Sequence, residues 1–197
     1  MLERPIREIA LLASLAPWAA CQRPQAQRAT GNLPDAQGAW SQGAASARSL
    51  DTLARDSAVR ALLRQHPTTR LAFDSDNRNP WLDTLQKTDP TYHPYRAAGD
   101  LNGDGRVDLV VALYDSSSAT NQPFLLYYLP ATEHALGPPQ LLAATDWLAN
   151  AGLFVDHGEL SAGEFYSDVF VTFHWDSLTR RLMLTPCDSV GPFRCLR

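Results

Sequence analysis

The chain has 197 residues, a formal net charge of −4 at neutral pH and three cysteines. A slightly acidic chain argues against nucleic acid or another polyanion as its partner. The sequence contains no Gly-x-Ser-x-Gly elbow, no His-Glu-x-x-His pair and no glycine-rich phosphate loop, which excludes the common hydrolase and nucleotide-binding motifs. We therefore expect a protein that is not an enzyme.

Residues 1–21 have the pattern of an export signal. Arg4 and Arg7 precede an uncharged run over 9–20, which at about 12 residues is too short for a membrane span of about 20. The run ends in Ala19-Ala20-Cys21, which resembles the lipobox of bacterial lipoproteins, with Trp18 where a leucine is usual. This resemblance implies cleavage before Cys21 and lipidation of its thiol. An ordinary cleaved signal, or an apolar helix of the fold, is the alternative.

The residues after Cys21 predict a tether in the periplasm. Gln22 resembles the second residue of lipoproteins that are sent to the outer membrane. Residues 22–48 are rich in Ala, Gln, Gly, Ser and Pro and have too few large apolar side chains to offset the entropy of ordering. As a coil, this segment would span roughly 30 Å. We expect it to hold a folded domain, residues 49–197, clear of the membrane.

The remaining cysteines, Cys187 and Cys195, suit an oxidising compartment. They lie eight residues apart around Gly191-Pro192, and a bridge closing so short a loop would stabilise the fold by roughly 2–3 kcal/mol. We predict a disulfide between them if the protein is exported, and two free thiols if it is not.

Helical spacing appears early in the folded part. Ser49 is a plausible N-cap for an amphipathic helix that runs to about Gln65, and Pro67 stops it. A second short helix is expected over 81–87, and 141–148 also has a helical composition. Strands are expected at four further places, over 92–98, 106–114, 124–129 and 153–155.

The C-terminal part alternates between apolar and polar residues. Val169, Val171, Phe173 and Trp175 recur with a period of two, which is typical of a sheet with one buried face. Further short strands are expected over 163–166 and 180–185. The pattern as a whole predicts an α+β domain, an antiparallel sheet with the N-terminal helix packed on it.

One stretch carries the clearest chemistry, the segment from Asp100 to Asp108. Oxygen-bearing side chains recur at four positions of this nine-residue stretch, with glycine at its sixth position. These side chains and one backbone carbonyl are Asp100, Asn102, Asp104, the carbonyl of Arg106, and Asp108. A hard cation such as Ca²⁺ takes six to eight oxygens at about 2.3–2.6 Å, so the pattern predicts a calcium loop between two strands.

The loop has two other interpretations. Asn-Gly and Asp-Gly are common in hairpin turns, so a metal-free turn is the simpler alternative, but a turn does not require carboxylates at the first, fifth and ninth positions together. An EF-hand needs a glutamate at the twelfth position, where this chain has Ala112, and a helix after the loop. We therefore expect a strand, and not the helix of an EF-hand, after the loop.

The stretch from Gly99 to Val111, GDLNGDGRVDLVV, resembles the calcium-binding segment of the FG-GAP (integrin-like) repeat. The resemblance implies Ca²⁺ bound by the four oxygen-bearing side chains in a loop between adjacent strands. It covers about 15 residues. FG-GAP repeats occur in series and build a propeller, whereas this chain has one copy, so a propeller is not predicted.

Two weaker polar clusters remain. Glu159 and Glu164 could face each other across a hairpin as the acid and base of a glycosidase, although a polar turn is the simpler interpretation. Asp74, Asp76 and Asn77 could form a second cation loop, but Arg78 stands where a fifth-position oxygen is needed, so a turn or helix cap is favoured.

These features predict an exported, lipid-anchored, Ca²⁺-binding protein that acts as a binding module. Its partner would be a protein or a cell-wall component. Small calcium-loop lipoproteins of this shape resemble periplasmic inhibitors, the immunity proteins that block hydrolases of the cell wall. A cell-wall hydrolase using Glu159 or Glu164 and a structural envelope lipoprotein are the alternatives.

Overall fold

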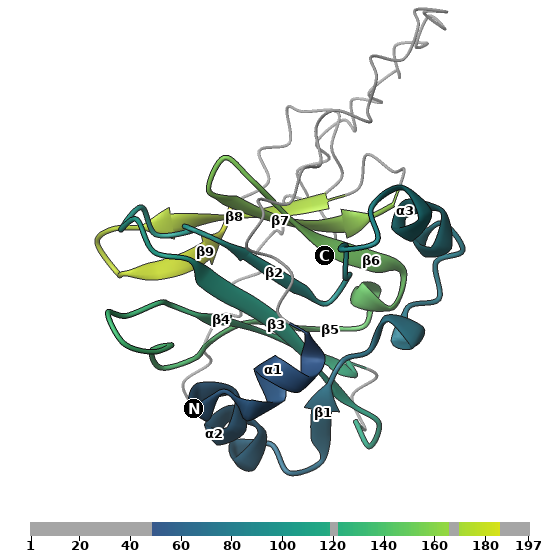
Figure 1. Cartoon of the computed structure of the whole chain (residues 1–197), viewed down its shortest axis with the longest axis horizontal. Coiled ribbons are helices and arrows are strands. Elements are labelled where there is room, and N and C mark those ends of the chain that lie inside the picture. The colour runs from purple at the N-terminus through teal and green to yellow at the C-terminus, as the bar shows by residue number, and fades with distance from the viewer. Residues whose placement is uncertain (1–48, 119–121, 166–169, 186–197) are drawn as a thin grey trace, which may run out of the picture. The chain divides into compact units, whose positions relative to one another are not determined.

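The computed structural model describes residues 49–118, 122–165 and 170–185 (Figure 1). The predicted signal over 1–21 with Cys21, the tether over 22–48, and the Cys187–Cys195 disulfide lie outside these residues. No helix within the described ranges is long and apolar enough to cross a membrane.

The first sheet is antiparallel and is built around β3 (Asp108–Asp115). One edge of β3 pairs first with β2 (Arg96–Gly99) and then, further along, with β1 (Thr69–Leu71). The other edge pairs with β4 (Phe124–Leu129), and β4 pairs with β5 (Gln140–Thr145). The predicted calcium loop therefore joins two neighbouring strands, β2 and β3.

The second sheet is a four-stranded antiparallel meander. Its strands are β6 (Ala151–Asp156), β7 (Glu159–Glu164), β8 (Phe170–Asp176) and β9 (Arg181–Leu184). The turn between β6 and β7 has two residues, His157 and Gly158, with φ angles of 47° and 82°. Positive φ at both positions is the conformation that suits a two-residue hairpin turn.

The two sheets face each other across the main core. Val110 and Ala112 of β3 face β6–β9, and with Leu153 and Leu160 they belong to one buried cluster. The sheets are also joined at both sides. The Leu153 N–H donates to the Pro94 carbonyl at 3.0 Å, while the Gln140 carboxamide bonds both backbone groups of Leu182.

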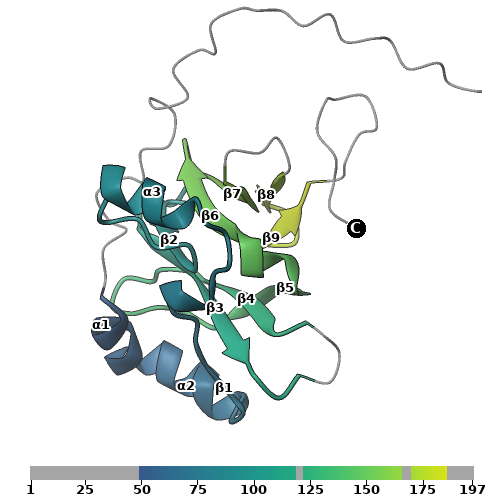
Figure 2. The same cartoon turned by 90° about the vertical axis from the view of Figure 1, so that its right-hand side faces the viewer.

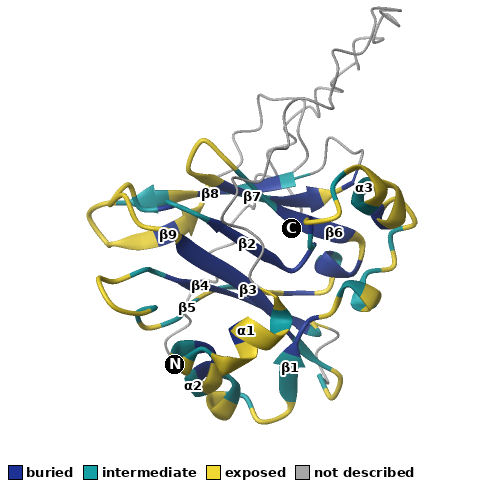
Figure 3. Ribbon diagram, in the orientation of Figure 1, coloured by how far each residue is buried: buried dark blue, intermediate teal, exposed yellow. Residues whose placement is uncertain are grey.

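Two short helices cover the other face of the first sheet (Figure 2). They are α1 (Leu50–Arg55) and α2 (Ser57–Gln65). Their buried residues share a second core with β1, β3 and β4; these helix residues are Leu53, Val59 and Leu62. Because both of its faces are covered, β3 is buried along most of its length (Figure 3). This explains its unbroken apolar run.

A third helix, α3 (Leu82–Thr88), packs through Leu82 on Tyr92 and Phe165. The single turns η2 (Asp74–Asp76) and η3 (Trp147–Asn150) are 3₁₀ helices. The segment between η2 and α3 lies against η3 and β6, because the Arg78 N–H donates to the Ala149 carbonyl at 2.6 Å.

The antiparallel character of the fold is confirmed. Two finer predictions are wrong, and the helix over 49–65, which Ser49 caps as predicted, is confirmed in part. The strands form two sheets instead of one. The expected helix over 49–65 is broken at Asp56, whose carboxylate accepts from the Ala58 N–H and caps α2. The expected helix over 141–148 is strand β5 followed by η3, because its short apolar run pairs with β4.

Candidate calcium loop

The loop from Asp100 to Val107 leaves β2 and enters β3, and it is anchored at both ends. Leu101 is buried in the core between the sheets. The turn of the β6–β7 hairpin lies beside it, since a Cβ added to Gly158 would be 3.1 Å from the Asp100 carbonyl oxygen. The loop therefore lies where the two sheets meet. Its tip, 103–107, is exposed.

Asp108, the last of the predicted ligands, is fully buried and takes three hydrogen bonds. Its Oδ2 accepts from the Leu101 N–H at 3.1 Å and the Tyr128 hydroxyl at 3.0 Å, and its Oδ1 accepts from the Ala131 N–H at 2.7 Å. A carboxylate has about four acceptor sites, so one remains for a further partner. Burial raises the pKa of this carboxyl, and these three donors offset only part of the increase.

The other three side chains bond to the loop's own backbone. Asp100 accepts from the N–H groups of Asp104 and Gly105 at 3.0 and 2.9 Å. Asn102 accepts from the Asp104 N–H at 2.9 Å, and Asp104 accepts from the Arg106 N–H at 2.9 Å. The Arg106 N–H lowers the pKa of the Asp104 carboxyl, which keeps it ionised. These bonds curl the loop around its acidic side chains.

Two glycines make this curl possible. Gly103 and Gly105 have φ angles of 75° and 81°, in the left-handed region that other residues enter at a cost. An added Cβ would meet no atom within 4 Å at either position, so glycine is needed for backbone conformation and not for space.

The residues present fit a hard cation by their chemistry. The donor set consists of oxygens only: Asp100, Asn102, Asp104, Asp108 and the Arg106 carbonyl. Asp104 also lies 3.3 Å from the Arg106 guanidinium, which an ion would displace or share. Within the described ranges, no three Asp, Glu, His or Cys side chains converge as a ready-made metal site. Ion binding would therefore have to draw the carboxylates together.

Sequence reasoning missed two partners of this loop, Tyr128 and Ala131. Tyr128 reaches Asp108 because the pairing of β4 with β3 sets Tyr128 opposite Val110, two residues after Asp108. Ala131 follows β4 by two residues. No motif links these positions to Asp108, since the contact arises from strand pairing.

Glu159 and Glu164, considered as the alternative acid–base pair, do not face each other. Glu159 begins β7 and Glu164 ends it, so both lie on one strand instead of facing each other across a hairpin. A separation of five residues corresponds to roughly 16 Å, whereas paired carboxyls of glycosidases lie about 5–10 Å apart.

The second acidic cluster belongs to η2, as the helix-cap interpretation predicts. Asp76 forms a two-point ion pair with Arg70, at 2.7 Å for each bond, and also accepts from the Phe73 N–H. Asp74 turns the other way, and its Oδ2 lies 2.8 Å from both Gln86 Nε2 and His93 Nδ1. The two carboxylates thus serve different contacts.

Comparison with known proteins found no matching family model, no matching curated protein and no matching solved structure.

Proposed function

We propose that this is an exported, lipid-anchored Ca²⁺-binding protein that acts as a non-enzymatic binding module. The observation that carries the calcium assignment is Asp108. Its carboxylate is fully buried, forms no ion pair within the described residues, and lies at the end of a loop with two further carboxylates. A buried charge without a counter-charge is costly, and a cation in the loop would compensate it.

The ion's role would be structural. Asp100, Asn102, Asp104, the Arg106 carbonyl and Asp108 would hold it, with water supplying the remaining oxygens. A bound Ca²⁺ would supply positive charge to a loop whose residues include three carboxylates. The loop lies beside the β6–β7 hairpin, so ordering it would stiffen the junction of the two sheets.

Binding of Ca²⁺ to the full chain tests this assignment. A ligand that binds only the folded state stabilises it by about 2.7 kcal/mol at a concentration 100 times its Kd. Thermal unfolding in Ca²⁺ and in chelator should therefore differ, and isothermal titration should record heat. Asp104→Ala should abolish both effects, whereas Glu133→Ala, at an exposed acid outside the loop, should change neither. Equal melting temperatures with and without Ca²⁺, and no heat, would refute the assignment.

The proposed anchor is Cys21, and the proposed partner is a protein or a cell-wall component. By analogy with periplasmic inhibitors, we propose a cell-wall hydrolase as the protein partner. Cys21→Ser should move the protein from the membrane fraction to the soluble fraction. The purified chain should inhibit such a hydrolase, and a pull-down of the chain from periplasmic extract should recover the enzyme. A pull-down that recovers no hydrolase would reject this partner.

A further inference from the structure

A positively charged side chain is buried in the first sheet without a contacting counter-charge. Arg96, the first residue of β2, is 6% exposed, and its Nε is shielded from solvent with no hydrogen-bond partner among the described residues. The arginines that form ion pairs within the described ranges are Arg70 and Arg106. An arginine is almost never buried so deeply unless an acceptor or an anion complements it. The complement of Arg96 is therefore either a nearby carboxylate or a ligand.

Asp108, the other buried charge in the described ranges, faces the opposite side of the sheet. Residues alternate between the two faces of a strand. Ala97 of β2 and Val110 of β3 lie in the core between the sheets, and Asp108, two residues before Val110, shares that face. Arg96 precedes Ala97 and stands opposite Val111, which packs with α1 and α2 in the second core. Arg96 therefore points to the face on which α1 and α2 lie, and it cannot pair with Asp108.

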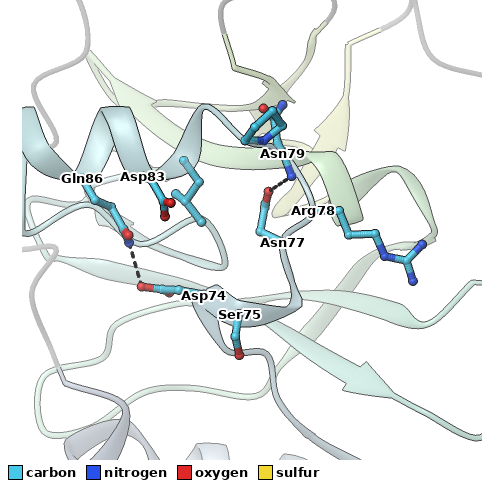
Figure 4. Close-up of a pocket in the computed structure, with 9 residues that line it drawn as sticks. Asp74, Ser75, Asn77, Arg78, Asn79, Asp83 and Gln86 are labelled. Carbon is cyan, nitrogen blue, oxygen red and sulfur yellow. Dashed lines mark hydrogen bonds between the residues drawn. The ribbon is translucent and has the colours of Figure 1, made fainter.

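Asp74 is the carboxylate whose charge reaches Arg96, and this carboxylate already has two other partners. Its Oδ2 lies 2.8 Å from Gln86 Nε2, at the wall of a pocket between η2 and α3 (Figure 4). The same oxygen lies 2.8 Å from His93 Nδ1. Burial lowers the pKa of the Arg96 guanidinium, and the charge of Asp74 offsets only part of this decrease. The two charges therefore interact without direct contact, and the guanidinium still lacks an acceptor.

The chemistry of the guanidinium determines which ligand can complete this site. Its N–H groups only donate and its charge is permanent, so the ligand must accept hydrogen bonds and carry negative charge. A cation would be repelled, and a neutral hydroxyl would leave the buried charge uncompensated.

The shape of the site favours a flat anion. The two Nη groups of Arg96 form no hydrogen bond to the described residues, and unlike Nε they are not shielded, so this end of the fork faces the solvent. A carboxylate presents two coplanar oxygens that match two N–H groups of the planar fork. Because so little of the residue is exposed, a flat carboxylate can approach this end more closely than a tetrahedral phosphate.

We propose that Arg96 binds a carboxylate, which a small organic acid or an acidic side chain of a partner peptide would present at this face of the first sheet. The site shares no residue with the loop over 100–108, so it stands whether or not that loop binds Ca²⁺.

Nuclear magnetic resonance titration of the labelled full chain with sodium acetate, at an ionic strength held constant with chloride, tests the proposal. Acetate should bind with a Kd of about 10 mM or tighter and shift the amides of 95–98 and the Arg96 Nε–H. Arg96→Gln should weaken this binding at least about tenfold, because it keeps a donor but loses the charge and the fork. Arg60→Gln, at an exposed arginine of α2, is the matched control and should leave binding unchanged.

Thermal unfolding gives a second readout that does not depend on chemical shifts. In chloride, Arg96→Met should be at least as stable as the unchanged protein, since it removes a buried charge that the described residues do not pair. Acetate should raise the melting temperature of the unchanged protein and not that of Arg96→Met. A marked loss of stability of Arg96→Met in chloride, or its failure to fold, would overturn the proposal, because the guanidinium would then have a partner within the chain.

Two further probes separate the sources of the anion. N-acetyl-aspartate N-methylamide presents a carboxylate on a peptide, whereas inorganic phosphate presents a tetrahedral anion. Tighter binding of the peptide probe than of acetate would identify a partner's side chain as the source, and weaker binding would identify a free acid; both results support a carboxylate site. Phosphate binding at 95–98 without carboxylate binding, no binding of any probe, or acetate binding that Arg96→Gln retains would overturn the proposal.

Discussion

The Tyr128 hydroxyl donates to Oδ2 of Asp108 at 3.0 Å, which ties the end of the loop over 100–108 to strand β4. Both groups are buried. The loop and the central pair of strands therefore share one polar contact, and the stability of the sheet and the shape of the loop depend on the same carboxylate.

Tyr128→Phe should destabilise the protein by about 1.5–3 kcal/mol, because it removes a hydrogen bond to a buried charged group. Tyr127→Phe is the matched control. Its hydroxyl bonds His66 Nε2 at 2.7 Å in a partly buried pair, and losing this bond should cost about 0.5–1.5 kcal/mol. Urea unfolding of both variants gives the comparison. Equal costs would show that the Asp108 contact is an ordinary one.

Tyr92→Phe should leave the stability unchanged or raise it by up to about 1 kcal/mol. The Tyr92 hydroxyl is buried and, within the described residues, has no hydrogen-bond partner, so removing it ends a desolvation cost. Gly152→Ala should act in the opposite direction and cost about 1–3 kcal/mol, because a Cβ there would overlap Tyr92 Oη and the Phe165 ring.

The double variant Tyr92→Phe/Gly152→Ala measures how far these two positions depend on each other. With the hydroxyl gone, part of the overlap is relieved, so the double variant should be more stable than the sum of the single effects. Thermal unfolding of the four proteins gives this coupling. A large loss of stability in Tyr92→Phe alone would mean that the hydroxyl has a partner, such as a buried water.

The Arg70–Asp76 ion pair should make stability depend on acidity. Burial alone would raise the pKa of Asp76, but the Arg70 guanidinium and the Phe73 N–H together hold its pKa below the usual value of 3.8. The stabilisation is therefore present above pH 3.8 and is lost as the pH falls through the lower, folded-state pKa.

Asp76→Asn should lower stability at neutral pH and flatten its decline between about pH 4 and pH 2. Unfolding in urea at several pH values tests this, with Glu133→Gln, at an exposed acid, as the control. If the stability of Asp76→Asn declined at low pH as steeply as that of the unchanged protein, another carboxyl would govern acid unfolding.

Gln140→Ala should open one of the contacts between the sheets. Its Nε2 donates to the Leu182 carbonyl at 2.7 Å, and its Oε1 accepts from the Leu182 N–H at 3.2 Å. Removing the carboxamide leaves two backbone groups unpaired, with an expected cost of about 1–3 kcal/mol and faster hydrogen exchange at the Leu182 amide. Gln65→Ala, at an exposed glutamine that ends α2, is the matched control. Unchanged exchange at Leu182 would contradict this role.

Local patterns were enough to predict several elements. The period of two after Val169 placed β8 and the burial of Val171 and Phe173, and the apolar run over 124–129 coincides with β4. The composition around Asp100 predicted a loop between two strands, which the structure has. These features depend on neighbours in the chain, and such neighbours act through backbone preference and side-chain alternation.

Other features depend on residues far apart in the chain. Leu141–Leu148 has a helical composition, yet the first part of this segment pairs with β4 as strand β5. Pairing with a strand elsewhere in the chain outweighs a weak local preference for helix. The division into two sheets, the Tyr128–Asp108 contact and the pocket between η2 and α3 likewise arise where segments meet. A loop between two strands could thus be predicted from the residues of 100–108 alone, whereas its anchoring to β4 and its place at the junction of the sheets depend on the packed chain.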